Sequence, residues 1–139
     1  PRSDFIKGVT ASIGLAHRVA FPGYLTDVEL SALMRNASGL VFPSLYEGFG
    51  LPVLEAMATG VPVACSNVTS LPEVAGEAAI FFDPQKTMDI AQALLDLVLD
   101  KPLRCQLIEK GYRQAERYSD TGKMVSEYWS IFESVLCRY

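Results

Sequence analysis

Short apolar runs alternate with longer amphipathic segments along this chain. The run at 40–42 is apolar on both faces, as a central parallel strand must be. Two further apolar runs predict strands at 61–65 and 79–82, and a fourth strand is predicted at 18–21, before a Pro-Gly pair. Because short links and helical segments separate these strands, the pattern predicts an α/β fold with a parallel sheet.

Helices are predicted from capping residues and from helical periodicity. Thr26 and Glu29 have the spacing of a capping box, in which a hydroxyl and a carboxylate satisfy amides at the start of a helix that runs to Gly39. Further helices are predicted at 51–59, 71–74, 103–118 and 123–136, and around a stripe formed by Ile90, Leu94, Leu97 and Val98. No element is predicted for residues 1–15, because their apolar positions have no clear period.

The length and composition are those of a globular domain. The chain has 139 residues, of which 50% are hydrophobic and 20% are charged, and this excludes a disordered chain. With a formal net charge of −4, the chain has no positive electrostatic field to attract the phosphates of a nucleic acid. No apolar run is long enough for a transmembrane helix, and the first residues do not form a signal peptide. Because the chain does not begin with Met, we expect it to be cut from a longer protein.

The cysteines and the histidine do not form a recognisable site. Cys65, Cys105 and Cys137 are odd in number and far apart, and His17 is the chain's single histidine. This spacing fits neither a disulfide framework nor a zinc site. We therefore expect free thiols in a reducing cytosol, and no metal.

The segment between the strand at 40–42 and the helix at 51–59 carries the candidate chemistry. In open parallel sheets, ligands bind where strands end and helices begin. Gly48 and Gly50 allow the backbone to approach a ligand closely, and the unpaired amides at the helix start favour an anion. Glu55, one turn into the helix, can accept hydrogen bonds from both hydroxyls of a ribose. Glu47 would be repelled by bound phosphates and is therefore expected beside the sugar portion of a ligand.

Simpler interpretations of this segment stay open on the residues alone. Glycines often serve only as turns, and the third glycine position of a dinucleotide fingerprint is Val53 here. There is no P-loop, because no Gly-Lys-Ser or Gly-Lys-Thr occurs. Glu55 can be a solvated helix residue, and Glu47 a partner of the helix dipole.

Residues 47–58 resemble the Glu-x7-Glu signature of the retaining GT-B glycosyltransferases of the group-one (family-four) type. The resemblance extends in order over about residues 17–120, including the Leu-Pro-Glu-Val segment at 71–74. It implies a Rossmann-like parallel sheet with flanking helices, the C-terminal half of a GT-B fold, truncated at its N-terminal side. The donor would be a nucleoside-diphosphate sugar, and the anomeric configuration would be retained.

The resemblance also implies a domain plan for residues 1–139, as a single partial domain. Residues 1–15 would be a remnant, 16–120 the nucleotide-sugar-binding core and 121–139 a C-terminal helix. Without the first strands of the domain, the strand at 40–42 would have an unpaired edge. We expect a homo-oligomer through this exposed surface, with the apolar side of the C-terminal helix as a second candidate interface.

By family analogy, the site residues take separate roles. Glu47 would be catalytic, by stabilising positive charge at the anomeric carbon. The substrate-binding residues would be Ser44, Gly48, Phe49, Gly50, Leu51 and Glu55, with Glu55 on the ribose hydroxyls. No metal and no cofactor are expected. The Arg and Lys that neutralise the diphosphate in the family are not assigned here.

The function implied is the donor-binding part of a hexosyltransferase that acts in polysaccharide or glycolipid synthesis. We expect this chain alone to be inactive, with a glycan or lipid-linked acceptor bound by an absent N-terminal domain. The location would be cytoplasmic, and peripheral at the membrane where the acceptor is lipid-linked. Two alternatives remain, a non-catalytic sugar-nucleotide-binding module and another GT-B enzyme such as a nucleotide-sugar epimerase.

Overall fold

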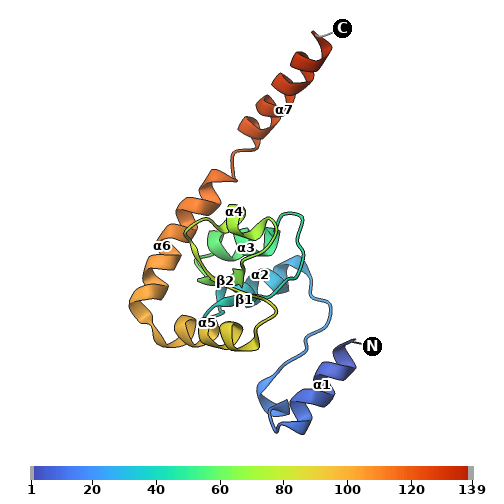
Figure 1. Ribbon diagram of the computed structural model, residues 1–139, viewed down its shortest axis with the longest axis vertical. Helices are drawn as coiled ribbons and strands as arrows, with labels where there is room; N and C mark the ends of the chain where they lie inside the picture. Colours follow the sequence, from blue (N-terminus) through green and yellow to red (C-terminus); the bar gives the residue numbers. More distant parts are fainter. Residues whose placement is uncertain (1, 138–139) are drawn as a thin grey trace. The chain divides into compact units, whose positions relative to one another are not determined.

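A computed structural model describes residues 2–137 (Figure 1). Contacts within the chain form two units that divide between Ala32 and Leu33, inside the helix α2 (Asp27–Arg35). The domain plan drawn from the family resemblance stays a prediction. Each unit is described by itself below.

The first unit contains α1 (Arg2–Ser12), the 3-10 turn η1 (Ala16–Arg18) and the start of α2. The strand predicted at 18–21 is wrong, because Arg18 ends η1 and no strand forms over the described residues 19–21. A strand requires a hydrogen-bonded neighbour, and an apolar run does not by itself supply one. No element was predicted over α1, whose apolar residues do not gather on one face of the helix.

The capping box at the start of α2 is confirmed. The backbone N–H of Thr26 donates to Oε2 of Glu29 at 2.9 Å, and the N–H of Glu29 donates to Oγ1 of Thr26 at 3.4 Å. The first of these hydrogen bonds holds the pKa of Glu29 below its ordinary value. The helix ends at Arg35, four residues before the predicted end at Gly39.

The second unit contains a parallel sheet in the order β1-β2-β3. Its strands are β1 (Leu40–Phe42), β2 (Val63–Ser66) and β3 (Ala79–Phe82), so two predicted strands are confirmed and the middle one begins two residues late. Within the described residues β1 is an edge strand. This contradicts the interpretation of 40–42 as a central strand and agrees with the unpaired edge that the family resemblance implied there. The residues of β1 are half-buried, whereas all four residues of β2 are buried. The apolar content of β1 therefore reflects helices on both of its faces.

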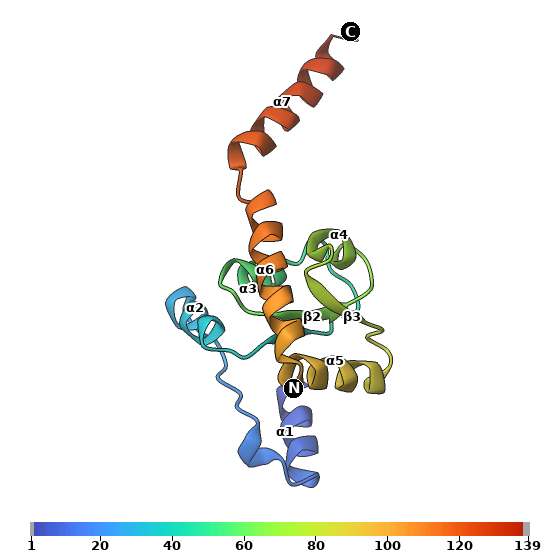
Figure 2. The same ribbon diagram turned by 90° about the vertical axis from the view of Figure 1, so that its left-hand side faces the viewer.

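Helices cover both faces of this sheet (Figure 1). On one face lie α3 (Leu51–Ala58) and α4 (Leu71–Ala75), and on the other lies α5 (Thr87–Leu99). The following helix, α6 (Lys101–Arg117), contacts both α3 and α5 (Figure 2). The predicted α/β class with a parallel sheet and flanking helices is confirmed.

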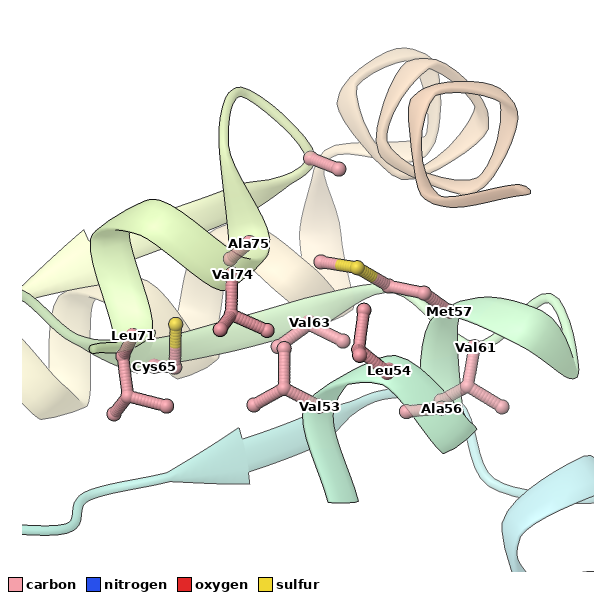
Figure 3. Close-up of a cluster of buried hydrophobic side chains, with 11 residues drawn as sticks. Val53, Leu54, Ala56, Met57, Val61, Val63, Cys65, Leu71, Val74 and Ala75 are labelled. Atoms are coloured by element: carbon pink, nitrogen blue, oxygen red, sulfur yellow. The ribbon is translucent and has the colours of Figure 1, made fainter. Parts of the chain in front are cut away.

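The register of the strands sorts their side chains between two cores. Val63 and Cys65 of β2 face the cluster that also contains Val53, Met57 and Leu71 (Figure 3). Between them, Ala64 faces the second cluster, with Phe82, Ala93, Leu97 and Leu107. This alternation is what a strand buried on both faces requires. Burial also raises the pKa of the Cys65 thiol to about 12, so that the thiol stays protonated at neutral pH.

Two predicted apolar faces differ from the observed ones. On α5, Ala93 and Leu97 are buried, whereas Leu94 and Val98 of the predicted stripe are exposed. The buried face of α5 therefore passes through Ala93 and Leu97 and leaves Leu94 outside it. For the helix at 51–59, the sequence predicts an apolar side of Leu54, Met57 and Ala58. The structure buries the first two, together with Val53 and Ala56, and exposes Ala58.

The final helix, α7 (Thr121–Leu136), carries the apolar side chains that were predicted to form a candidate interface. These side chains are exposed in the described structure: Met124, Tyr128, Trp129, Ile131, Phe132, Val135 and Leu136. An oligomer formed through this surface or through the β1 edge stays a prediction.

Candidate functional site

The glycine loop, defined here as residues 43–50, joins the end of β1 to the start of α3. Gly50 is buried and adopts a φ of 101°, in the left-handed region that favours glycine. A Cβ at this position would lie 2.6 Å from Cδ2 of Leu71, on α4. Gly50 is therefore required both by its backbone conformation and by the space available. Gly48, in contrast, has nothing within 4 Å of a Cβ.

Glu47 is half-buried, and hydrogen bonds hold its backbone N–H, its carbonyl oxygen and its carboxylate. Its backbone N–H donates to Oγ1 of Thr69 at 3.2 Å, and its carbonyl oxygen accepts from Oγ of Ser70 at 2.9 Å. Its carboxylate accepts from Oγ of Ser44 at 3.2 Å. The same Ser44 hydroxyl lies 2.9 Å from the carbonyl oxygen of Tyr46, so its single proton is shared. Ser44, predicted to bind substrate, contacts the predicted catalytic carboxylate in this structure.

Thr69 and Ser70 belong to the bracing loop, defined here as residues 67–70, which follows β2. These two residues were missed by the sequence analysis. A signal was present, because β1 and β2 are parallel neighbours and the carboxyl ends of parallel strands meet at one edge of the sheet. Polar residues directly after the second strand could therefore have been predicted to lie beside the glycine loop.

Glu55 lies on the exposed side of α3, and the helix buries Val53 and Met57 against the sheet. No side chain caps the start of α3 among the described residues, where Gly50 is the N-cap residue. The first turn of such a helix carries a partial positive charge. Pro52 has no N–H, however, and the N–H of Val53 donates to the carbonyl oxygen of Gly50 at 3.0 Å. The site thus combines the positive end of a helix with a solvent-accessible carboxylate one turn along it.

The remaining predicted site residues turn toward the end of α6. The ring of Phe49 meets the ring of Tyr118 edge-on, with centroids 5.6 Å apart. Phe49 and Leu51 are exposed in part and line, with Tyr118 and Tyr128, a cavity of about 520 Å³. The structure therefore gives the Phe49 side chain an aromatic contact, and the predicted binding of substrate by Phe49 and Leu51 stays a prediction.

Two features are absent from the described residues. No group of three or more His, Cys, Asp or Glu side chains is arranged to hold a metal ion there. Within the same part of the chain, no helix is both long enough and apolar enough to cross a membrane. The expected lack of a cofactor, the cytoplasmic location and the peripheral association with a membrane stay predictions.

Comparison with known proteins identifies the family. Residues 1–114 match the profile of the family "Glycosyl transferases group 1", and the chain belongs to this family. It is 46% identical over 101 residues to the O-antigen chain mannosyltransferase B of Escherichia coli, covering 73% of this chain and 26% of that protein. It is 34% identical over 132 residues to the MMP alpha-(1->4)-mannosyltransferase of Mycolicibacterium hassiacum, covering 92% of this chain and 32% of the relative.

A solved structure supports the same assignment. The fold is similar to that of the sucrose-phosphate synthase from Thermosynechococcus elongatus, with a TM-score of 0.81 and 27% identity. The match covers 96% of this chain and 34% of that chain. The predicted Rossmann-like half of a GT-B fold is confirmed. The chain spans about a quarter to a third of the length of these three relatives.

Proposed function

We propose that this chain is the donor-binding part of a retaining glycosyltransferase, in which the sugar of a nucleoside-diphosphate donor is transferred to a glycan or lipid-linked acceptor. The observation that supports the proposal best is the held Glu47, on a glycine loop that leads into the uncapped start of α3. The positive end of a helix suits a diphosphate. Glu55, exposed one turn further along, suits the two hydroxyls of a ribose.

The proposed roles follow from charge. The backbone at Gly48, Phe49, Gly50 and Leu51 would contact the donor sugar and the diphosphate. Glu47 would lie beside the sugar, because a carboxylate close to phosphate is repelled. There its negative charge would stabilise the positive charge that develops at the anomeric carbon as the bond to the diphosphate breaks.

We propose mannose as the transferred sugar. The support is that the two curated relatives described above are both named mannosyltransferases. The name of one of them, an O-antigen chain mannosyltransferase, further supports a growing glycan as the acceptor. The transferase activity would belong to a longer protein, and residues 1–139 alone would be inactive. A leaving diphosphate requires cationic compensation, and none of this chain's basic residues is assigned to that role.

The test is calorimetric titration of GDP, UDP and ADP, and then of the matching nucleoside-diphosphate mannose, into the chain. We expect one nucleotide to be selected, with its affinity at least about tenfold lower in Glu55→Gln, because hydrogen bonds to a charged group are lost. Glu47→Gln should weaken binding of the nucleotide sugar while leaving binding of the nucleotide unchanged. Glu109→Gln, which changes an exposed carboxylate on α6, is the matched control. Nucleotide affinity that Glu55→Gln leaves intact, or no binding at all, would overturn the proposal.

A further inference from the structure

We propose that Thr69 and Ser70 are positioning residues that fix the glycine loop and thereby aim its amides and Glu47 at the donor. The identity of the ligand in this inference rests on the proposed function. The geometry rests on the hydrogen bonds between the glycine loop and the bracing loop. Neither residue lies in the Glu-x7-Glu segment, and they follow a different strand.

Ser70 contacts the glycine loop on both sides of Gly48. Its hydroxyl lies 2.9 Å from the carbonyl oxygen of Glu47 and 3.1 Å from that of Phe49. In a planar trans peptide, the C=O of one residue and the N–H of the next point in opposite directions. Holding these two carbonyl groups at Ser70 therefore directs the N–H groups of Gly48 and Gly50 away from it. Two amides are oriented by one hydroxyl.

Thr69 holds the other end of the same peptide segment. Its Oγ1 accepts from the N–H of Glu47 at 3.2 Å and donates to the carbonyl oxygen of Val68 at 2.8 Å. Its φ is 55°, which makes it the single non-glycine residue with a positive φ in the described part of the chain. A β-branched residue is strained in this conformation, and such strain persists where surrounding contacts determine the backbone.

Packing against α4 adds a third contact to the glycine loop. Leu71, which directly follows Ser70, is fully buried and would collide with any side chain at Gly50. The bracing loop therefore meets the glycine loop at Glu47 and Phe49, and the first residue of α4 meets it at Gly50. A loop fixed in this way binds its ligand without first losing conformational entropy.

The first experiment measures loop order without any ligand, by amide hydrogen exchange and ¹⁵N relaxation of the whole chain. We expect Ser70→Ala to increase the mobility of Gly48, Phe49 and Gly50. Thr69→Ala should accelerate exchange of the Glu47 N–H, and Thr69→Ser, which keeps the hydroxyl, should restore it. Ser130→Ala removes a comparable hydroxyl-to-carbonyl bond within α7 and is the matched control. Unchanged loop amides in both alanine variants would overturn the inference.

The second experiment measures affinity for the nucleoside-diphosphate sugar in the same variants. We expect Ser70→Ala and Thr69→Ala to weaken binding by about tenfold, because misplaced binding groups lose most of their effect. Thr69→Ser should recover the affinity, and the unfolding midpoint should stay close to that of the wild type. Wild-type affinity in both alanine variants would overturn the positioning role and leave the proposed function intact. Absence of donor binding by the wild-type chain would instead overturn the proposed function, and the exchange data alone would then decide whether the bracing loop orders the glycine loop.

Discussion

The region around β2 and the region before Leu33 are built differently. Every residue of β2 is buried, and Met57, which belongs to the same buried cluster, is 1% exposed. Among residues 4–32, in contrast, no described side chain is buried, and Phe5 and Ile13 are 73% and 61% exposed. Both regions lie within the part of the chain that matches the family profile.

The candidate site belongs to the region that contains β2. The glycine loop lies between β1 and α3, next to the large buried cluster, and Gly50 is itself buried. Residues 4–32 carry no buried side chain. Both regions match the family profile, so the match does not show which residues support the site. Burial does distinguish the two regions.

The largest expected effect comes from emptying the core. Met57→Ala should lower the free energy of unfolding by about 3 kcal/mol, because a buried cavity replaces the side chain. Ile13→Ala in the first region should change it by less than about 0.5 kcal/mol, because the side chain is already exposed. Urea unfolding followed by circular dichroism measures both. Equal losses in the two variants would contradict the contrast between the regions.

A smaller effect is expected at the glycine loop itself. Gly50→Ala should destabilise the chain by about 2 kcal/mol, because the new Cβ meets Leu71 and the left-handed backbone becomes strained. Gly48→Ala is the control, since open space surrounds that position, and its effect should be within about 0.5 kcal/mol. Thermal and urea unfolding measure the change in the free energy of unfolding for both variants. A Gly48→Ala variant as unstable as Gly50→Ala would show that flexibility, and not close packing, explains both glycines.

The smallest effect is expected at the capping box in the first region. Hydrogen bonds from Thr26 hold the pKa of Glu29 below its ordinary value of 4.5, so the ionised carboxylate stabilises the start of α2. This stabilisation is present above that value and is lost as the pH falls through the lowered pKa in the folded chain. Amide exchange of Leu30, whose N–H donates to the carbonyl oxygen of Thr26, should therefore become less protected under acid.

Thr26→Ala should weaken the protection of Leu30 about fivefold at neutral pH and remove most of its acid dependence. The midpoint of urea unfolding should hardly change, because this helix start lies outside the buried cluster. A large shift of the midpoint would mean that the first region contributes to the same cooperative unit as β2.

The fold was predictable where local signals and burial agree. Strands β1 and β3 have their predicted bounds, because each apolar run ends at a residue that breaks it, Pro43 or Asp83 followed by proline. The strand predicted at 18–21 failed, because pairing depends on a neighbour that no local pattern encodes. The exposure of Leu94 on α5 was likewise not predictable, because helical spacing places it beside the buried Leu97 and does not say which of the apolar residues faces the sheet.

The place of the predicted site residues in the fold was predictable, whereas the contacts that support them were not, and the roles of these residues stay predictions. The sequence predicted Glu47, Gly48 and Gly50 between a strand and a helix and Glu55 within that helix, and the structure has them there. The part played by Thr69 was not predictable, because it depends on the order of strands in the sheet and on a strained backbone conformation. The parallel strand order brings the two loops to one edge of the sheet, whereas the hydrogen bonds between them become visible only in three dimensions.

The thiol in the middle of the sheet provides a reporter of the protein's own motions. Cys65 is buried, whereas the other two cysteines of the chain, Cys105 and Cys137, are exposed. A reagent in solution can reach the sulfur of Cys65 only when the sheet separates from the helices that cover it. The rate of the slow phase of thiol labelling therefore measures how often the domain opens. A ligand that raises or lowers this rate would be detected without attaching a dye or fluorophore to the protein beforehand.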